Sequence, residues 1–118
     1  MKGNKMTTLV DNILGECESV ISGVEVIQEL TENNKAFNMF EFDDLRCMAE
    51  ELQSLVVDSE DDISTNEFAV ELSITMYQEI KYLSEAVEEI TTDSEILNEL
   101  GYIRAAVDII REIGRAHV

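Results

Sequence analysis

Oxygen-bearing side chains in the middle of the chain have the spacing of a calcium-binding loop. Glu60, Asp62, Ser64, Asn66 and Glu71 fall at positions 1, 3, 5, 7 and 12 of a twelve-residue segment. Position 6 of this segment is not the glycine that the sharp turn of such a loop requires. In addition, the last residues of the segment fit better as the first turn of a helix, where carboxylates interact favourably with the helix dipole. We therefore expect no calcium site.

Glutamates four residues apart are the second set that could do chemistry. Carboxylates hold metal ions in helical enzymes where they project into the core between helices. Helical phasing instead places these pairs opposite the apolar positions, and no glycine-rich or basic element accompanies them to hold phosphate. We expect no metal, no cofactor and no enzymatic activity. The pairs are Glu67 with Glu71, Glu85 with Glu89, and Glu95 with Glu99.

Cysteine and histidine add no further site. Cys17 and Cys47 do not form a C-x-x-C pair, and both lie close to apolar stripes, so we expect free thiols that are buried as small apolar side chains. The single histidine, His117, has no neighbours with which to form a ligand cluster or a catalytic triad.

Apolar residues that recur every three or four positions predict four amphipathic helices. The first covers about residues 8–30 and the second begins near Asn38, where Asn38 and Glu41 have the spacing of a capping box, and continues to Val56. The third follows a cap at Ser64 and ends at Ile90, and the fourth follows a cap at Thr92 and ends near Gly114. The prediction is a single all-α domain over residues 1–118. It is a four-helix antiparallel bundle with a short acidic loop between helices two and three, and residues 1–6 form a disordered tail.

The charge of the chain is strongly one-sided. The 118 residues include 26 acidic and 8 basic ones, for a net charge of -18. Residues 41–99 contain 18 of the acidic residues but only two basic ones, Arg46 and Lys81. Solubility requires a net charge of only about 2 to 8 in a small domain. Nucleic acid and anionic lipid would be repelled, so we expect a positively charged protein as partner.

The carboxylates of this segment could imitate the phosphates of a nucleic acid. A protein that binds nucleic acid offers a groove lined with lysine and arginine, and rigidly held carboxylates could occupy that groove. We expect these side chains to act as phosphate surrogates and to face water. They are Glu50, Glu51, Asp58, Glu60, Asp61, Asp62, Glu67, Glu71, Glu85, Glu88 and Glu89.

In size, acidity and expected helical build, the chain resembles the small nucleic-acid-mimicking inhibitors of phages and mobile elements. That resemblance implies a non-enzymatic inhibitor of a restriction enzyme, a CRISPR effector or another nuclease. One alternative is a helical adaptor or immunity-type protein that binds its partner through an apolar or small-residue face, with acidity serving solubility. Another is a solvated acidic domain of different purpose.

Small residues on the first predicted helix suggest a second contact surface. Gly15, Ser19 and Gly23 follow one another at steps of four, with Val26 and Leu30 close to the same line. Small side chains let another backbone approach closely. A homodimer face, an internal close crossing of two helices and an exposed strip of small residues are the alternatives.

The sequence also predicts where the protein acts. The first residues lack the continuous apolar stretch of a signal peptide. No apolar run approaches the roughly 18 residues that span a bilayer. We expect a cytoplasmic protein that does not insert into a membrane.

Overall fold

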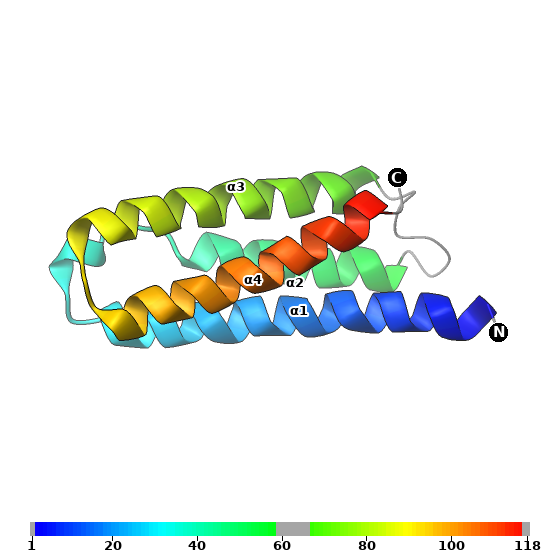
Figure 1. Ribbon diagram of the computed structural model, residues 1–118, viewed down its shortest axis with the longest axis horizontal. Helices are drawn as coiled ribbons and strands as arrows, with labels where there is room; N and C mark the ends of the chain where they lie inside the picture. The colour runs from blue at the N-terminus through cyan, green and yellow to red at the C-terminus, as the bar shows by residue number, and fades with distance from the viewer. Residues whose placement is uncertain (1, 59–66, 117–118) are drawn as a thin grey trace.

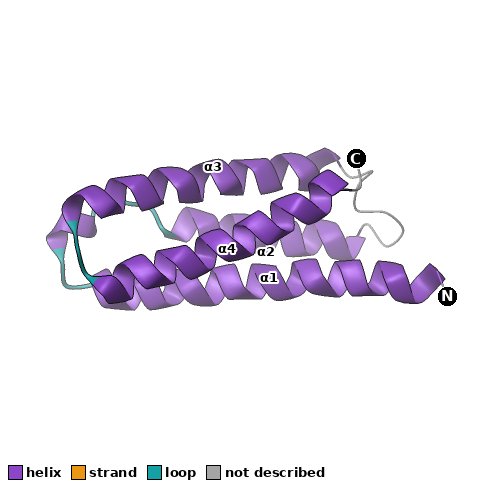
Figure 2. Cartoon of the chain, viewed as in Figure 1, coloured by secondary structure: helices purple, strands orange, loops and turns teal. Residues whose placement is uncertain are grey.

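Four long helices run side by side in the computed structural model, which describes residues 2–58 and 67–116 and the side chains of residues 11–57 and 67–113. They are α1 (Lys2–Thr31), α2 (Asp43–Asp58), α3 (Glu67–Ile90) and α4 (Ser94–Ala116), with a one-turn 3-10 helix η1 (Lys35–Phe37) between α1 and α2. The described ranges contain no strand (Figure 2). The predicted all-α bundle is confirmed.

Consecutive helices run in opposite directions and connect at alternate ends of an elongated molecule measuring 50 × 20 × 19 Å (Figure 1). Each helix packs on two others: α1 on α2 and α4, and α3 on α2 and α4. The helices therefore stand at the corners of a square, with α1 diagonal to α3. As a result, the first and last helices of the chain form one side of the bundle and α2 and α3 form the opposite side.

One continuous apolar core fills the space between the helices. Each helix contributes side chains spaced three or four residues apart, which lie on one face of an α-helix. Burying each large aliphatic side chain contributes roughly 1.5–3 kcal/mol. The largest fully buried side chains are Ile13, Val20, Val24, Ile27, Leu45, Leu52, Val56, Met76, Ile80, Leu83, Ile103 and Ile110.

Helix α2 begins at Asp43, five residues later than predicted, so the capping box predicted at Asn38 and Glu41 is wrong. Asn38 instead ends η1, where its N–H donates to the carbonyl of Lys35. Phe37 and Phe42 explain the difference, because both are buried. Residues five apart on a continuous α-helix point about 140° away from each other, so a helix through this segment could not direct both rings into the core.

Phe40 joins the two buried rings into an aromatic cluster that closes this end of the bundle. Its ring centroid lies 6.2 Å from that of Phe37 and 5.8 Å from that of Phe42, within the range of favourable aromatic pairs. Asn34 fixes the turn, since its side-chain Oδ1 accepts a hydrogen bond of 3.0 Å from the N–H of Ala36.

The other helix starts also differ from the prediction by a few residues. Helix α1 begins at Lys2, so residues 2–6 extend the helix where a disordered tail is predicted. Extending a formed helix costs little once it is nucleated, and no proline stops it. The cap predicted at Thr92 is also wrong, because the Oδ1 of Asp93 accepts a hydrogen bond of 2.9 Å from the N–H of Glu95. The cap predicted at Ser64 lies outside the described residues.

Replacing the capping carboxylate should weaken the bundle. We expect Asp93→Ala to lower the free energy of unfolding by about 1 kcal/mol, since the N–H of Glu95 then loses its acceptor. Thr92→Ala should change it by only a few tenths of a kcal/mol, because Thr92 lies one position before the cap. Denaturant unfolding of the two variants measures the difference. Equal losses would contradict Asp93 as the cap.

Gly23 sets the distance between α1 and α4. It is buried, and a Cβ atom added to it would lie 2.5 Å from Cγ1 and 3.0 Å from Cδ1 of Ile103. Real Cβ atoms do not approach other atoms so closely, so only glycine permits this packing of Ile103 against α1. Gly15, in contrast, has no heavy atom within 4 Å of the position of such a Cβ.

These two glycines should respond to the same substitution in opposite directions. Gly15→Ala should raise the free energy of unfolding by up to about 1 kcal/mol, because alanine is the better helix former and nothing obstructs it. Gly23→Ala should lower it by about 1–3 kcal/mol in spite of the same propensity gain, because Ile103 must move. Thermal unfolding of both variants tests this. Stabilisation by both substitutions would show that α4 is not held against Gly23.

Candidate functional site

Exposed carboxylates cover the outer sides of α2 and α3, which we call the acidic face. Among the described side chains of these helices, the only basic ones are Arg46 and Lys81. Glu79 is half-buried, and the remaining carboxylates are exposed. The exposed members are Asp43, Asp44, Glu50, Glu51, Glu67, Glu71, Glu85, Glu88 and Glu89.

The density of carboxylates on the acidic face is close to the density of phosphates on one nucleic-acid strand. Helix α3 has 24 residues and is therefore about 36 Å long, and the shorter α2 lies alongside it. The acidic face has nine exposed carboxylates on these two helices, two of which pair with Arg46. This gives one carboxylate per about 4 Å, against 3.4 Å per charge on a single strand and roughly 1.7 Å on a duplex.

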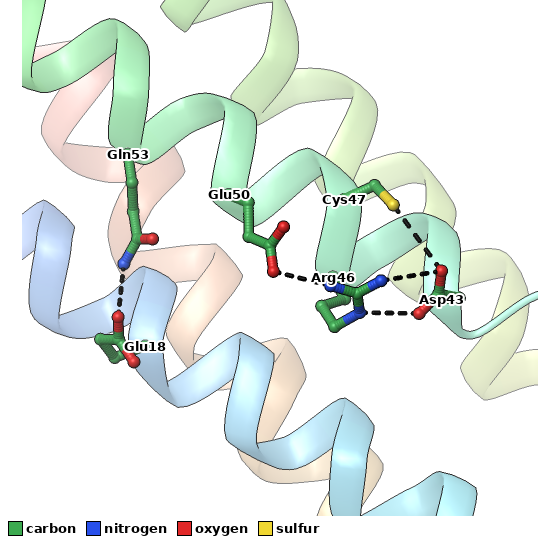
Figure 3. Close-up of polar contacts among 6 residues, drawn as sticks. All are labelled: Glu18, Asp43, Arg46, Cys47, Glu50 and Gln53. Atoms are coloured by element: carbon green, nitrogen blue, oxygen red, sulfur yellow. Dashed lines mark hydrogen bonds and ion pairs between the residues drawn. The ribbon is translucent and has the colours of Figure 1, made fainter.

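Arg46 compensates part of this charge (Figure 3). Its Nε and Nη2 donate to the two carboxylate oxygens of Asp43, at 2.7 and 3.1 Å, and its Nη1 donates to Glu50 at 2.7 Å. The hydrogen bonds from Arg46 hold the pKa of Asp43 below its usual value. Glu50, which the sequence predicts as a phosphate surrogate, therefore shares its charge with a cation. Glu50 therefore has less negative charge available for a cationic partner.

The other described surrogates are exposed as predicted, and the contacts within the described ranges place no cation on them. They form a broad band rather than one row. Tyr77 of α3 lies under the guanidinium of Arg111 of α4, 4.1 Å from ring centroid to Cζ, which identifies the side of α3 that faces α4. Glu88, eleven residues after Tyr77, lies on that same side. Glu67, Glu71, Glu85 and Glu89 point outward, within about 40° of one another around α3.

Part of the predicted set cannot be placed. Glu60, Asp61 and Asp62 lie outside the described residues, as does the side chain of Asp58. Most of the rejected calcium loop and His117 also lie there. Within the described ranges, no three His, Cys, Asp or Glu side chains come together in a way that could hold a metal ion.

Two exposed aromatic rings stand among the carboxylates of α3, and the sequence reasoning missed them. Phe68 and Tyr82 are 73% and 62% exposed. Both fall outside the three-and-four spacing of the buried positions of α3, which is the signal that could have found them. They add flat apolar surface to the acidic face.

The small residues of α1 do not form one external surface. Gly23 packs against Ile103 inside the chain, so the internal-crossing alternative holds for this glycine. Gly15 and Ser19 are exposed, and Leu30 is 37% exposed. Ser19 and Val26 instead line an open groove between α1 and α4.

This groove has a volume of about 420 Å³ and lies on the side of the bundle opposite the acidic face. Three apolar side chains along it are open to solvent: Tyr102 is 69% exposed, Ile109 45% and Val26 38%. Two half-buried carboxylates, Glu16 and Glu99, also line it. Glu99 thus turns toward α1. Helical phasing predicted instead that it projects straight outward as a pair with Glu95. The lining residues are Glu16, Ser19, Ser22, Gly23, Val26, Glu99, Tyr102, Ala105, Ala106 and Ile109.

The two cysteines differ from each other. Cys17 is buried as predicted, and burial, followed by the charges of Glu18 and Glu16, raises the pKa of its thiol to about 12. Cys47 is exposed, so its predicted burial is wrong. It lies two residues after the buried Leu45, about 200° around the helix from it. Limited desolvation and then the charge of Asp43, whose Oδ2 lies 3.7 Å from the sulfur, raise the pKa of Cys47.

No family model matches this sequence, and no curated protein and no solved structure matches it either. None of the helices in the described ranges has a stretch long and apolar enough to cross a membrane. Inference about function therefore starts from the acidic face and the groove.

Thiol labelling should separate the two cysteines. In the folded protein at about pH 8, we expect a thiol reagent to modify Cys47 and to leave Cys17 unmodified until the chain unfolds, because only an accessible thiolate reacts. In Cys47→Ser, no fast-reacting thiol should remain. Fast labelling of folded Cys47→Ser would contradict the burial of Cys17.

The raised pKa of Cys17 also links the free energy of unfolding to pH. The stabilising contribution of the protonated Cys17 thiol is complete below the unfolded pKa near 9 and is lost as the pH rises toward about 12.

Proposed function

We propose that this protein is a non-enzymatic inhibitor that acts in the cytoplasm and docks its acidic face into the positively charged nucleic-acid channel of a target protein. The target class is a nuclease, such as a restriction enzyme or a CRISPR effector, or another protein that binds DNA or RNA. The carboxylates of α2 and α3 take the place of phosphates, so the chain itself binds no nucleic acid.

The observation that carries this proposal is the charge density of the acidic face. A cationic channel that accommodates one strand encounters a similar number of anions per unit length along α2 and α3. The density is less than half that of a duplex, so a channel for single-stranded nucleic acid, or for one strand of a duplex, fits better than one that encloses both strands.

The rigidity of the helices and the repulsion between neighbouring carboxylates support the same proposal. The carboxylates project from helices whose opposite faces are buried in one core, so little backbone freedom is lost when they bind. Like charges three or four residues apart on a helix repel by a few tenths of a kcal/mol per pair, and Glu67 with Glu71 and Glu85 with Glu89 bear that cost. Folding gains nothing from this repulsion, whereas docking into a cationic channel would offset it.

The alternative is a helical adaptor or immunity-type protein that recognises its partner through an apolar or small-residue face. The observation that favours it is the open groove between α1 and α4, with exposed Tyr102 and Ile109. Ionic strength distinguishes the two functions. Affinity through the acidic face should fall steeply as salt rises, whereas apolar docking should change little.

Charge reversal on α3 tests the proposal. The quadruple variant Glu67→Lys, Glu71→Lys, Glu85→Lys and Glu89→Lys should lose its partner, with at least about a hundredfold weaker binding, because steering and charge complementarity both reverse. The measurement is affinity capture from the natural host at low salt with wild-type and variant proteins as bait. Mass spectrometry identifies what elutes, and added DNA or RNA oligonucleotides should displace the captured proteins.

A matched control separates the acidic face from net charge. Reversal of Asp11, Glu25, Glu29 and Glu95 to lysine changes the net charge by the same amount, but on exposed positions of α1 and α4. This control should capture the same partners as the wild type. Circular dichroism should show unchanged helical content for both variants. The proposal would be contradicted if the α3 variant captured the same proteins, or if oligonucleotides did not displace the captured proteins from the wild type.

A further inference from the structure

The groove between α1 and α4 joins apolar surface to unpaired negative charge. Tyr102, Ile109 and Val26 leave between 38 and 69% of their surface exposed along it, next to the small side chains of Ser19 and Ala105. Apolar side chains that gather in this way on a soluble surface mark contact sites.

Several solvent-facing positions along the groove are uncharged. The outward positions of α1 and α4 beside it include Ser19, Ser22, Tyr102, Ala105 and Ile109, none of which is charged. An apolar surface that covers them does not have to strip water from exposed carboxylates. On a chain with a net charge of -18, such a strip is a distinct surface.

Glu16 and Glu99 specify what the occupant must carry. Both are half-buried, and the described contacts show no cation at either one. The Oε1 of Glu99 lies 3.6 Å from the position that a Cβ on Gly23 would take, so its carboxylate sits at the level of Gly23. Glu16 is seven residues from Gly23 on α1, which is about 10.5 Å along the helix axis. The two carboxylates are therefore about two helical turns apart along the groove.

A helix with two basic residues seven positions apart matches this spacing. Such residues also lie about 10.5 Å apart and on nearly the same side of the helix, and the positions three and four residues after the first fall between them. Apolar side chains at those positions would meet Tyr102, and apolar side chains beyond the two basic residues would meet Val26 at one end of the groove and Ile109 at the other. An amphipathic helix laid in an apolar groove is a common mode of recognition.

A second copy of this chain fits the groove less well. Two copies facing each other through this side would bring Glu16 and Glu99 toward carboxylates of the same sign. The described cations of α4, Arg104 and Arg111, lie on the opposite side of that helix, where Arg111 covers Tyr77 of α3. The same face of a second copy therefore presents no described cation to these glutamates.

From these observations we infer that the groove between α1 and α4 binds an amphipathic helix of another protein, which places lysine or arginine residues seven positions apart against Glu16 and Glu99. This inference does not depend on the function of the acidic face. The two surfaces lie on opposite sides of the bundle and can be altered separately.

A designed peptide tests the inference directly. The probe is a stapled helical peptide of about 18 residues, built from alanine and leucine with two lysines seven positions apart on the apolar side and a fluorescent label. We expect saturable binding to the wild-type protein by fluorescence anisotropy. Glu16→Gln with Glu99→Gln should weaken it at least about tenfold, because each lysine loses a charged partner. Ala105→Trp should prevent it by filling the groove.

Matched controls exclude general attraction to an acidic protein. Glu85→Gln with Glu89→Gln removes the same charge from α3 and should leave affinity within about twofold, since those positions lie more than a Debye length away across the bundle. A peptide with its lysines on the opposite side from its leucines should bind about tenfold more weakly. The proposal fails if the peptide does not bind saturably, or if the α3 variant loses as much affinity as the groove variant. It also fails if the wild type sediments as a dimer that Ala105→Trp dissociates, because the occupant would then be a second copy.

Discussion

Burial of one apolar stripe per helix holds together a chain whose surface charges repel one another. Each repulsive pair on α3 costs a few tenths of a kcal/mol. Each large side chain in the core, such as Leu52 or Ile80, contributes several times as much when it is buried. The core therefore tolerates an acidic face of one sign. On the described part of the acidic face, the ion pairs of Arg46 with Asp43 and Glu50 compensate some of this charge.

The period of the apolar residues was enough to predict the number of helices, their type and their approximate length, because this signal is local. The start of α2 was not predictable in this way. It depends on Phe37 and Phe42 both reaching the core, and that requirement appears only when the end of the bundle is closed. The cap of α4 was missed by one residue because Thr92 and Asp93 are both good caps, and only the hydrogen bond from Glu95 decides between them.

The candidate sites were predictable to different extents. Exposure of the carboxylates on α2 and α3 follows from helical phasing alone, so Glu51, Glu67 and Glu85 lie where the sequence indicates. Pairing of Glu50 with Arg46 follows from their spacing of four residues and was overlooked. The groove could not be predicted, because it needs the knowledge that α4 packs on α1. The role of Gly23 was unpredictable for the same reason. Its spacing from Gly15 suggested one external strip, whereas Gly23 packs against Ile103 of α4 inside the bundle.

Because α1 and α4 pack together and close the bundle, the acidic face and the groove lie on opposite sides. The two surfaces therefore bind partners through different interactions. The strongly acidic middle of the sequence forms α2 and α3 side by side, while α1 and α4 bear several uncharged, exposed positions along the groove between them. Long-range attraction from a net charge of -18 speeds the encounter of any basic protein with either side. It does not determine how long a complex lasts, because dissociation depends on short-range contacts. On the acidic face those contacts are themselves charged and weaken with salt, whereas the contacts of Tyr102 and Ile109 in the groove are apolar and do not. A basic protein that presents both a cationic channel and an amphipathic helix would therefore be drawn to the whole molecule but retained differently at its two sides.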